Sequence, residues 1–269
     1  MIKLIVTDMD GTLLDDQGKF PEGFSAFLQE MKQRGIRFVV ASGRQYPGLK
    51  KQFQEYLEDV AIIAENGAFV VWNEKELFVK KMTKEQLHTA LEGTKQVTGA
   101  KPMICAKYYS YMDDAAFCEE LRGAYFCYEM RHAEDLYGLD DDTILGMAVL
   151  NIPTEKLPWA YATLRPLLPE EISLTISGKH CMDVGLTGVN KGTAVQALQE
   201  IWHITPEETM VFGDQQNDLE MMSCAAYSYA MANASQVVKE QANFIAEDNN
   251  HAGVLRAVWD QLKQEEESR

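Results

Sequence analysis

Five polar residues with the chemistry to bind a metal ion or a phosphate group directly follow apolar runs typical of buried strands. They are Asp8 and Asp10 after IKLIVT, Ser42 after IRFVVA, Asn66 after VAIIAE, and Asp214 after TMVFG. The carboxyl ends of parallel strands meet at one edge of a sheet, where ligands bind in open α/β sheets. We therefore expect these side chains to converge there. Asp8 and Asp10 would lie on one side if the first strand stays extended through both.

Carboxylates brought from separate strand ends repel one another unless a cation lies between them. Asp8, Asp10 and Asp214 offer the hard oxygen ligands that Mg²⁺ prefers. Asp and Ser are also common turn and helix-cap residues, and this alternative would explain a single strand end. It explains poorly why several strand ends carry such residues, so the pattern favours a Mg²⁺ site.

A site for an anion is predicted around Lys191. This lysine falls in the first turn of a helix expected over 191–202, just after Asn190 as its cap. The helix dipole already makes that end positive, which disfavours a lysine by about 0.3–1 kcal/mol. Lysine and free backbone N–H groups together form an anion site, most simply for phosphate. A nucleotide P-loop is excluded, because Asn190 and Gly192 replace the Gly and Ser or Thr that the motif requires.

The elements that must position these residues alternate between strand and helix. Strands are expected at 2–7, 36–41 and 60–64, and helices from Pro21 and over about 47–57 separate them. This order predicts right-handed crossovers and a Rossmann-like parallel sheet with helices on both faces, an α/β fold. FVVW and LFVK flank four polar residues and predict a hairpin.

The alternation changes between about Met82 and Gly188. Helices are expected near 84–97 and 113–122, and mixed apolar and polar strands such as MICAKYY, ILGMAVLNI and ISLTIS lie around them. This pattern predicts an inserted α+β domain. We expect a discontinuous core formed by 1–82 and 189–269, with the insertion over 83–188.

The composition narrows the classes of partner. The formal net charge of −16 argues against nucleic acid or an anionic membrane as the main partner. Five cysteines without Cys-x-x-Cys spacing suggest free thiols in a reducing compartment. No stretch approaches the roughly 18 apolar residues of a membrane span, and Asp8 interrupts the first apolar run too early for a signal peptide. We expect a cytoplasmic monomer or weak dimer that binds a small molecule.

Four segments resemble, in order, the motifs of the haloacid dehalogenase (HAD) superfamily. They are DMDGT (8–12), VVASGR (39–44), the Lys191 of GVNKG, and GDQQND (213–218). AENGA (64–68), AMANA (230–234) and the chain length resemble its Cof-type branch, type IIB, and most closely the SupH-like sugar phosphatases. These are phosphatases with an α/β cap inserted between motifs two and three. Ala252 stands where this family usually carries an acid, so no function is assigned to the loop EDNNHAG (247–253), including His251.

The resemblance implies a role for each matched residue. Asp8 would be the nucleophile that forms an aspartyl-phosphate. Asp10 would protonate the leaving group and then deprotonate water. The Asp8 carboxylate, the Asp10 backbone carbonyl and the Asp214 carboxylate would hold Mg²⁺. The phosphoryl group would be bound by Ser42, Gly43, Lys191 and Asn217, with Thr12, Arg44, Asn66 and Asp218 in support.

The implied function is a Mg²⁺-dependent phosphomonoester hydrolase for small phosphorylated metabolites, with sugar phosphates as expected substrates. One alternative is a phosphomutase of the phosphomannomutase type. It would need a second phosphate clamp in the inserted domain, where Arg122, Arg131 and Arg165 are scattered. Another alternative is a non-enzymatic phospho-aspartate switch resembling a response-regulator receiver, which is much shorter and lacks a counterpart of Asp10.

Overall fold

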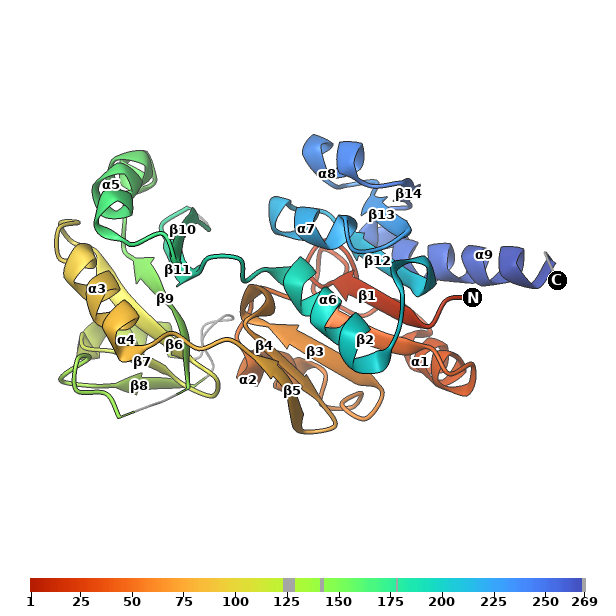
Figure 1. The fold of residues 1–269 in the computed structure, drawn as a ribbon, viewed down its shortest axis with the longest axis horizontal. Helices are drawn as coiled ribbons and strands as arrows, with labels where there is room; N and C mark the ends of the chain where they lie inside the picture. Colours follow the sequence, from red (N-terminus) through yellow and green to blue (C-terminus); the bar gives the residue numbers. More distant parts are fainter. Residues whose placement is uncertain (123–128, 141–142, 178, 268–269) are drawn as a thin grey trace. The chain divides into compact units, whose positions relative to one another are not determined.

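The computed structural model describes residues 1–122, 129–140, 143–177 and 179–267; helices and strands are labelled as in Figure 1. The chain forms two compact units. The first comprises Met1–Gly43, Gln52–Val79 and Asn190–Arg269, and the second comprises Arg44–Lys51 and Lys80–Val189. Within the described residues, no helix combines the length and the apolar composition needed to cross a membrane.

An eight-stranded sheet forms the centre of the first unit, in the order β14-β13-β12-β1-β2-β3-β4-β5. Its strands are β1 (Leu4–Asp8), β2 (Arg37–Ala41), β3 (Val60–Ala64), β4 (Phe69–Trp72), β5 (Lys75–Val79), β12 (Thr209–Gly213), β13 (Tyr227–Met231) and β14 (Phe244–Ala246). The strands from β14 to β3 are parallel, whereas β4 and β5 form an antiparallel hairpin. The predicted parallel sheet and hairpin are confirmed.

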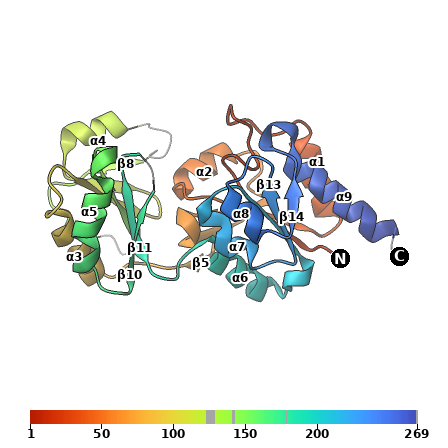
Figure 2. The same ribbon diagram turned by 90° about the horizontal axis from the view of Figure 1, so that it is seen from above.

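Helices cover both faces of this sheet. They are α1 (Phe24–Gln33), α6 (Lys191–Trp202), α7 (Leu219–Met222), α8 (Gln236–Gln241) and α9 (Gly253–Glu267). Figure 2 shows α6, α7 and α8 on one face, and α1 and α9 on the other. This layered arrangement confirms the predicted α/β fold class.

Strand β1 lies at the centre of the functional edge. All five of its residues are buried, which matches a strand covered on both faces and explains its nearly continuous apolar run. Val6 pairs with Val39 of β2 on one side and with Val211 of β12 on the other. Since the three strands are parallel and in register, the residues that follow them emerge at the same edge.

Two predicted helices differ from the observed ones. Helix α1 begins at Phe24 rather than Pro21, because Gly23 adopts a left-handed conformation (φ 80°) immediately before it. The helix predicted over 47–57 is limited to α2 (Tyr46–Gln52). Beyond it the chain continues in turns, in which Tyr56 N–H donates to the carbonyl of Phe53.

The second unit contains a six-stranded sheet in the order β10-β11-β9-β6-β7-β8, antiparallel except for the β7–β8 pair. The strands are β6 (Lys101–Ala106), β7 (Ser110–Met112), β8 (Met130–His132), β9 (Ile144–Leu150), β10 (Ile172–Ile176) and β11 (Met182–Leu186). Besides α2, its helices are α3 (Lys84–Thr94), α4 (Ala115–Leu121) and α5 (Leu157–Leu164). Strands and helices together give the α+β architecture predicted for the inserted segment.

Two apolar clusters hold this sheet. Leu87 of α3 and Leu164 of α5 belong to a cluster with Ile104 and Met147 of the sheet. Cys118 of α4 belongs to another, with Met103 of β6. Helix α5 was not predicted, because Pro158 and the exposed Trp159 obscure its apolar spacing. Strand β11 was also missed, since MDVGL contains Asp and Gly, residues depleted in strands.

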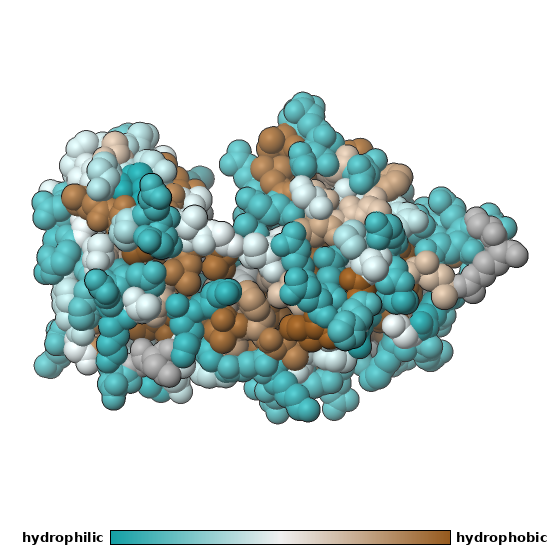
Figure 3. All heavy atoms as spheres, in the orientation of Figure 1, coloured by the Kyte–Doolittle hydropathy of each residue, from teal (hydrophilic) through white to brown (hydrophobic). Residues whose placement is uncertain are grey.

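The described cysteines agree with the prediction of free thiols. Cys105, Cys118, Cys181 and Cys224 form no disulfide, while Cys127 lies outside the described residues. Hydrophilic side chains cover most of the face seen in Figure 3, as expected for a chain with 66 charged side chains of Lys, Arg, Asp and Glu, of which 41 are acidic.

Candidate active site

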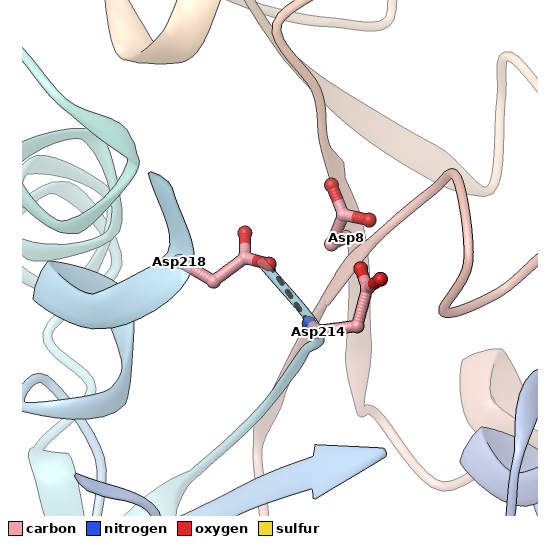
Figure 4. Close-up of side chains that lie close together, drawn as sticks. All are labelled: Asp8, Asp214 and Asp218. Atoms are coloured by element: carbon pink, nitrogen blue, oxygen red, sulfur yellow. Dashed lines mark hydrogen bonds between the residues drawn. The ribbon is translucent and has the colours of Figure 1, made fainter. Parts of the chain in front are cut away.

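Three carboxylates gather at the carboxyl edge of the first unit's sheet. Asp8 is the last residue of β1, Asp214 directly follows β12, and Asp218 precedes α7 (Figure 4). One oxygen of each side chain lies within 4.8 Å of the others. Their residues are only 7%, 4% and 0% exposed, respectively. Buried carboxylates at this spacing require a compensating charge.

Lys191 supplies part of that charge. Its side chain is 1% exposed, and Nζ donates to Asp8 Oδ1 at 2.5 Å and to Asp218 Oδ1 at 2.7 Å. Burial alone would lower the pKa of Lys191, but the carboxylates of Asp8 and Asp218 outweigh this effect and raise the pKa. The lysine is therefore held as a cation, although it lies at the positive end of α6.

Asp218 organises the cluster with both of its oxygens. While Oδ1 accepts from Lys191, Oδ2 accepts from the backbone N–H groups of Asp214 (2.9 Å) and Gln215 (3.1 Å). Figure 4 shows this oxygen turned toward the Asp214 nitrogen. A Cβ on Gly213 would lie 2.5 Å from the Asp218 Cβ, so only glycine fits there. Asp218 thus stabilises the loop after β12 and orients Lys191.

Asp214 is held by three neighbours. Thr12 Oγ1 donates to its Oδ1 at 3.1 Å, and Gln215 Nε2 donates to its Oδ2 at 2.9 Å. Gly11 packs directly on the carboxylate: it has φ +78°, and a Cβ there would lie 2.7 Å from Oδ2. The sequence predicted the support from Thr12 but no role for Gln215, because the direction of a loop side chain leaves no pattern in the sequence.

The charges of the cluster favour the binding of a divalent cation. Burial raises the pKa of Asp8 to about 8; Lys191 opposes the shift, and the carboxylates of Asp218 and Asp214 add to it. Burial also raises the pKa of Asp214. Three carboxylates face one ammonium group, so the cluster carries an excess of negative charge when all are ionised. Hard oxygen donors with this excess suit Mg²⁺ or a similar ion.

The loops after β2 and β3 join the same edge. Ser42 is 2% exposed, and its carbonyl accepts from the N–H of Asn66 at 3.0 Å. The side chain of Asn66 accepts from Asn217 Nδ2 at 3.0 Å, which links it to the loop after β12. A Cβ on Gly43 would lie 3.0 Å from Asn66 Oδ1, so these loops pack closely. The predicted convergence of Ser42, Asn66 and Asp214 at one edge is therefore observed.

The start of α6 is fixed against the loop after β3. Gly67 has φ +106°, and a Cβ there would lie 2.1 Å from the carbonyl oxygen of Asn190. Asn190 caps α6: its side chain accepts from the N–H of Thr193, whose side chain accepts in turn from the N–H of Asn190. Lys191 is the next residue, so cap and loop together set the direction of its side chain.

Asp10 and Arg44 are placed differently from what the sequence predicted or apart from the other predicted site residues. Strand β1 ends at Asp8, and the chain turns at Met9, so the extended geometry that would align Asp10 with Asp8 is not present. Asp10 is exposed and forms a bridge with Leu14 in the turn that follows. Arg44 is half-buried and groups with the second unit.

Comparison with known proteins identifies the family. Residues 5–258 match the haloacid dehalogenase-like hydrolases. The chain is 35% identical over 269 residues to an Escherichia coli K12 protein named 5-amino-6-(5-phospho-D-ribitylamino)uracil phosphatase, covering 98% of this chain and 97% of that protein. A Bacillus subtilis phosphatase of the same name is 25% identical, covering 94% of this chain and 95% of that protein.

A solved structure agrees. SMU.1108c from Streptococcus mutans superposes with a TM-score of 0.84 at 28% identity, covering 98% of this chain and 100% of that one. The match to the family spans both units and the sheet edge at which the carboxylates, Lys191 and Ser42 meet. The chain therefore belongs to the haloacid dehalogenase-like hydrolases and is a phosphatase of that family.

Proposed function

We propose that this phosphatase is a Mg²⁺-dependent phosphomonoester hydrolase that works through an aspartyl-phosphate on Asp8. The observation that carries the proposal is the buried contact of Asp8 with Lys191, beside Asp214 and Asp218. An anionic nucleophile next to a lysine and a cation site can meet an anionic substrate. A receiver-like switch would not require a second acid close by in sequence, such as Asp10.

In the proposed reaction, Asp8 forms and breaks the covalent bonds to phosphorus, and Asp10 gives and takes the proton. The Asp8 oxygen attacks phosphorus, the bond from phosphorus to the leaving oxygen breaks, and Asp10 donates a proton to that oxygen. Asp10 then takes a proton from water, whose oxygen attacks the phosphorus of the aspartyl-phosphate. The Asp8–phosphorus bond breaks, which releases inorganic phosphate and restores both aspartates. Because Lys191 donates to Asp8 Oδ1, we assign the attack to Oδ2.

The phosphoryl oxygens would be bound by Ser42, the Gly43 N–H, Lys191 and Asn217. Ser42, Gly43 and Asn217 lie on loops joined through Asn66, and Lys191 is held by Asp8 and Asp218, so these groups would be arranged before the substrate arrives. We assign Thr12 and Asp218 to the support of Asp214 and Lys191, which their hydrogen bonds favour. Arg44 would assist from the chain segment after Gly43.

The residues that would hold Mg²⁺ are the Asp8 carboxylate, the Asp10 backbone carbonyl and the Asp214 carboxylate. When bound, the ion would offset the repulsion between the Asp8 carboxylate and the anionic substrate. A nearby cation favours the charged form of a carboxylate, so it would also counter the raised pKa of Asp8. The excess of negative charge in the cluster supports a divalent ion at this place.

We infer that the substrates are small phosphorylated sugars or sugar alcohols. The E. coli relative is named for a substrate with a phosphorylated ribityl chain, which supports this substrate class. We assign catalysis to 1–82 and 189–269 and propose that 83–188 form the cap that selects the leaving group. We further propose that the enzyme works in the cytoplasm as a monomer or weak dimer.

The test is phosphate release from p-nitrophenyl phosphate, 5-amino-6-(5-phospho-D-ribitylamino)uracil, ribitol 5-phosphate and hexose phosphates, with and without Mg²⁺. We expect release only with the metal, and none from an Asp8→Asn variant that retains the wild-type circular dichroism spectrum. Asp59→Asn, at an exposed ion pair with Lys32, is the matched control and should keep full activity. Full activity of Asp8→Asn would refute the nucleophile, and conversion of a hexose 1-phosphate to its 6-phosphate would indicate a mutase.

A further inference from the structure

We propose that Asn233 and Asn249 are positioning residues that hold the Asp10 loop in its working conformation. Neither residue belongs to the carboxylate cluster, and neither touches Asp8, Asp214 or Lys191 through any hydrogen bond of the described side chains. Both donate instead to the segment that follows β1. The inference rests on the proposed function, in which Asp10 is the proton donor and acceptor.

Asn249 is a buried amide that reaches 235 residues back along the chain. It is 4% exposed, and its Nδ2 donates to the carbonyl of Leu14 and to Asp16 Oδ1, both at 3.0 Å. Its backbone N–H donates to Asn233 Oδ1 at 3.3 Å. A buried amide with this set of partners is costly to disturb, because each partner would then lose its hydrogen bond.

Asn233 ties the other end of the same turn. Its Nδ2 donates to the carbonyl of Gly11 at 2.7 Å. The two asparagines therefore hydrogen-bond to the backbone carbonyls of Gly11 and Leu14. Between these two residues, the hydroxyl of Thr12 donates to Asp214. Asp10 lies at the edge of this clamped turn, bridged to Leu14. We call these hydrogen bonds of Asn233 and Asn249 the clamp, and we infer that they set the backbone position of Asp10.

The loop that presents Asn249 is itself rigidly built. Asp248 accepts from the backbone N–H of His251 at 3.1 Å. Ala252 adopts a left-handed conformation (φ 55°), and Gly253 follows at a place where a Cβ would lie 2.0 Å from the carbonyl oxygen of Glu247. The segment 247–253 thus has a structural reason for its shape. It directs Asn249 toward the turn after β1.

Both asparagines reach the turn after β1 from the same side of the sheet. Asn233 follows β13 and Asn249 follows β14, and these strands lie on the far side of β12 from β1. The turn after β1 is thereby held from the β13–β14 side, while Ser42 and Asn66 follow β2 and β3 on the other side. A proton donor misplaced by about 1 Å can cost about a hundredfold in rate, so this fixation matters for catalysis.

The experiment compares kcat/KM for two leaving groups in Asn233→Ala and Asn249→Ala. One substrate is p-nitrophenyl phosphate, whose leaving group needs little protonation; the other is the sugar phosphate hydrolysed fastest in the panel above. General acid catalysis contributes about 10²–10⁴-fold. We expect each variant to lose at least about tenfold on the sugar phosphate and markedly less on p-nitrophenyl phosphate. If Asn249→Ala does not fold, the exposed Asn233 still provides the test.

Two controls separate the possible outcomes. Gln199→Ala removes another buried amide, which donates to Thr209 Oγ1 and to the carbonyl of Cys224 far from the Asp10 turn; it should affect both substrates equally. Asp10→Ala sets the leaving-group dependence expected when the acid is lost. If Asp10→Ala shows that dependence but the asparagine variants do not, the inference is overturned and the proposed function stands. If Asp10→Ala lacks it, the acid role fails, and the inference fails with it.

Discussion

At the residue scale, the buried cation Lys191 holds the carboxylate cluster together. Lys191 is the cation that contacts two of the three clustered carboxylates, and its side chain is as buried as the hydrophobic core. Loss of a surface ion pair changes the free energy of unfolding little, whereas loss of one partner of a buried pair leaves an uncompensated buried charge and lowers it strongly. We therefore expect Lys191 to contribute both to the stability of the fold and to the proposed catalysis.

Removing this lysine should damage both properties. Lys191→Met leaves Asp8 and Asp218 without their ammonium partner, and breaking a buried pair in this way costs about 3–5 kcal/mol. We expect a fall of that size in the free energy of unfolding, measured by urea denaturation, and loss of phosphatase activity. Lys95→Met is the control, because Lys95 pairs with Glu92 on the surface; its urea midpoint should stay at the wild-type value. Equal midpoints for both variants would contradict the importance of the buried pair.

Two glycines with the same backbone conformation allow a matched comparison. Gly11 (φ +78°) and Gly23 (φ +80°) both adopt the left-handed region, where a Cβ costs about 1–2 kcal/mol. A Cβ on Gly11 would press on Asp214 Oδ2, whereas a Cβ on Gly23 meets nothing within 4 Å. We expect both Gly11→Ala and Gly23→Ala to lower the thermal unfolding temperature, and Gly11→Ala to lower it more because of this contact. Only Gly11→Ala should need more Mg²⁺ for half-maximal activity, and an unchanged requirement would argue against Asp214 as a ligand.

At the element scale, loops and helix ends place the site residues. The strands bring Asp8, Ser42 and Asp214 to one edge, and the start of α6 adds Lys191 to them. The loop after β3 contacts that helix start at Gly67, so the elements on the two sides of β1 are joined. The precision of the site depends on these short contacts rather than on the helices as a whole.

Two of the capping boxes in the described part of the chain, one in each unit, offer a test of this dependence. Asn190 caps α6 in the first unit, and Thr83 caps α3 in the second. Loss of an N-cap side chain costs about 1 kcal/mol. We expect Asn190→Ala and Thr83→Ala to lower stability by comparable amounts in urea denaturation. Only Asn190→Ala should reduce kcat, because Lys191 follows that cap directly; a similar loss of kcat in Thr83→Ala would contradict this reasoning.

At the scale of the whole molecule, the described chain forms two compact units, and the second has apolar clusters of its own. The carboxylates, Lys191 and the two asparagines lie in the first unit. The second unit has its own sheet and its own buried clusters, which include Leu87, Met147 and Met103. Ligands that bind the carboxylate cluster should consequently stabilise one unit and not the other.

Metal removal tests this division. A ligand at a hundred times its Kd stabilises the native state by about 2.7 kcal/mol. We expect Mg²⁺ to slow amide hydrogen exchange in β1 and β12 and to leave β6 and β9 unchanged, with chelation by EDTA reversing the effect. The same measurement on Asp214→Asn should show no slowing. Uniform slowing in both units would show that the metal acts elsewhere than at this cluster.

The sequence alone determined the architecture of the first unit and which polar residues stand at the ends of its strands. Apolar runs of strand length, each followed by Asp, Ser or Asn, indicated a parallel sheet with its polar residues at one edge, because burial and turn formation leave local patterns. The order of strands and helices indicated the inserted α+β segment for the same reason. The limits of α1 and α2 were less predictable, since a glycine conformation and a series of turns decided them.

Only the tertiary structure decided which of these residues touch. Lys191 contacts Asp8 across 183 positions of sequence, and Asn249 contacts Leu14 across 235. It also showed that β1 ends at Asp8, so that Asp10 is held by a clamped turn instead of by the strand. Contacts between distant segments arise from the register of parallel strands and the packing of their loops. Neither is written into the local spacing of residues, which is why the clamp of Asn233 and Asn249 emerged from the fold alone.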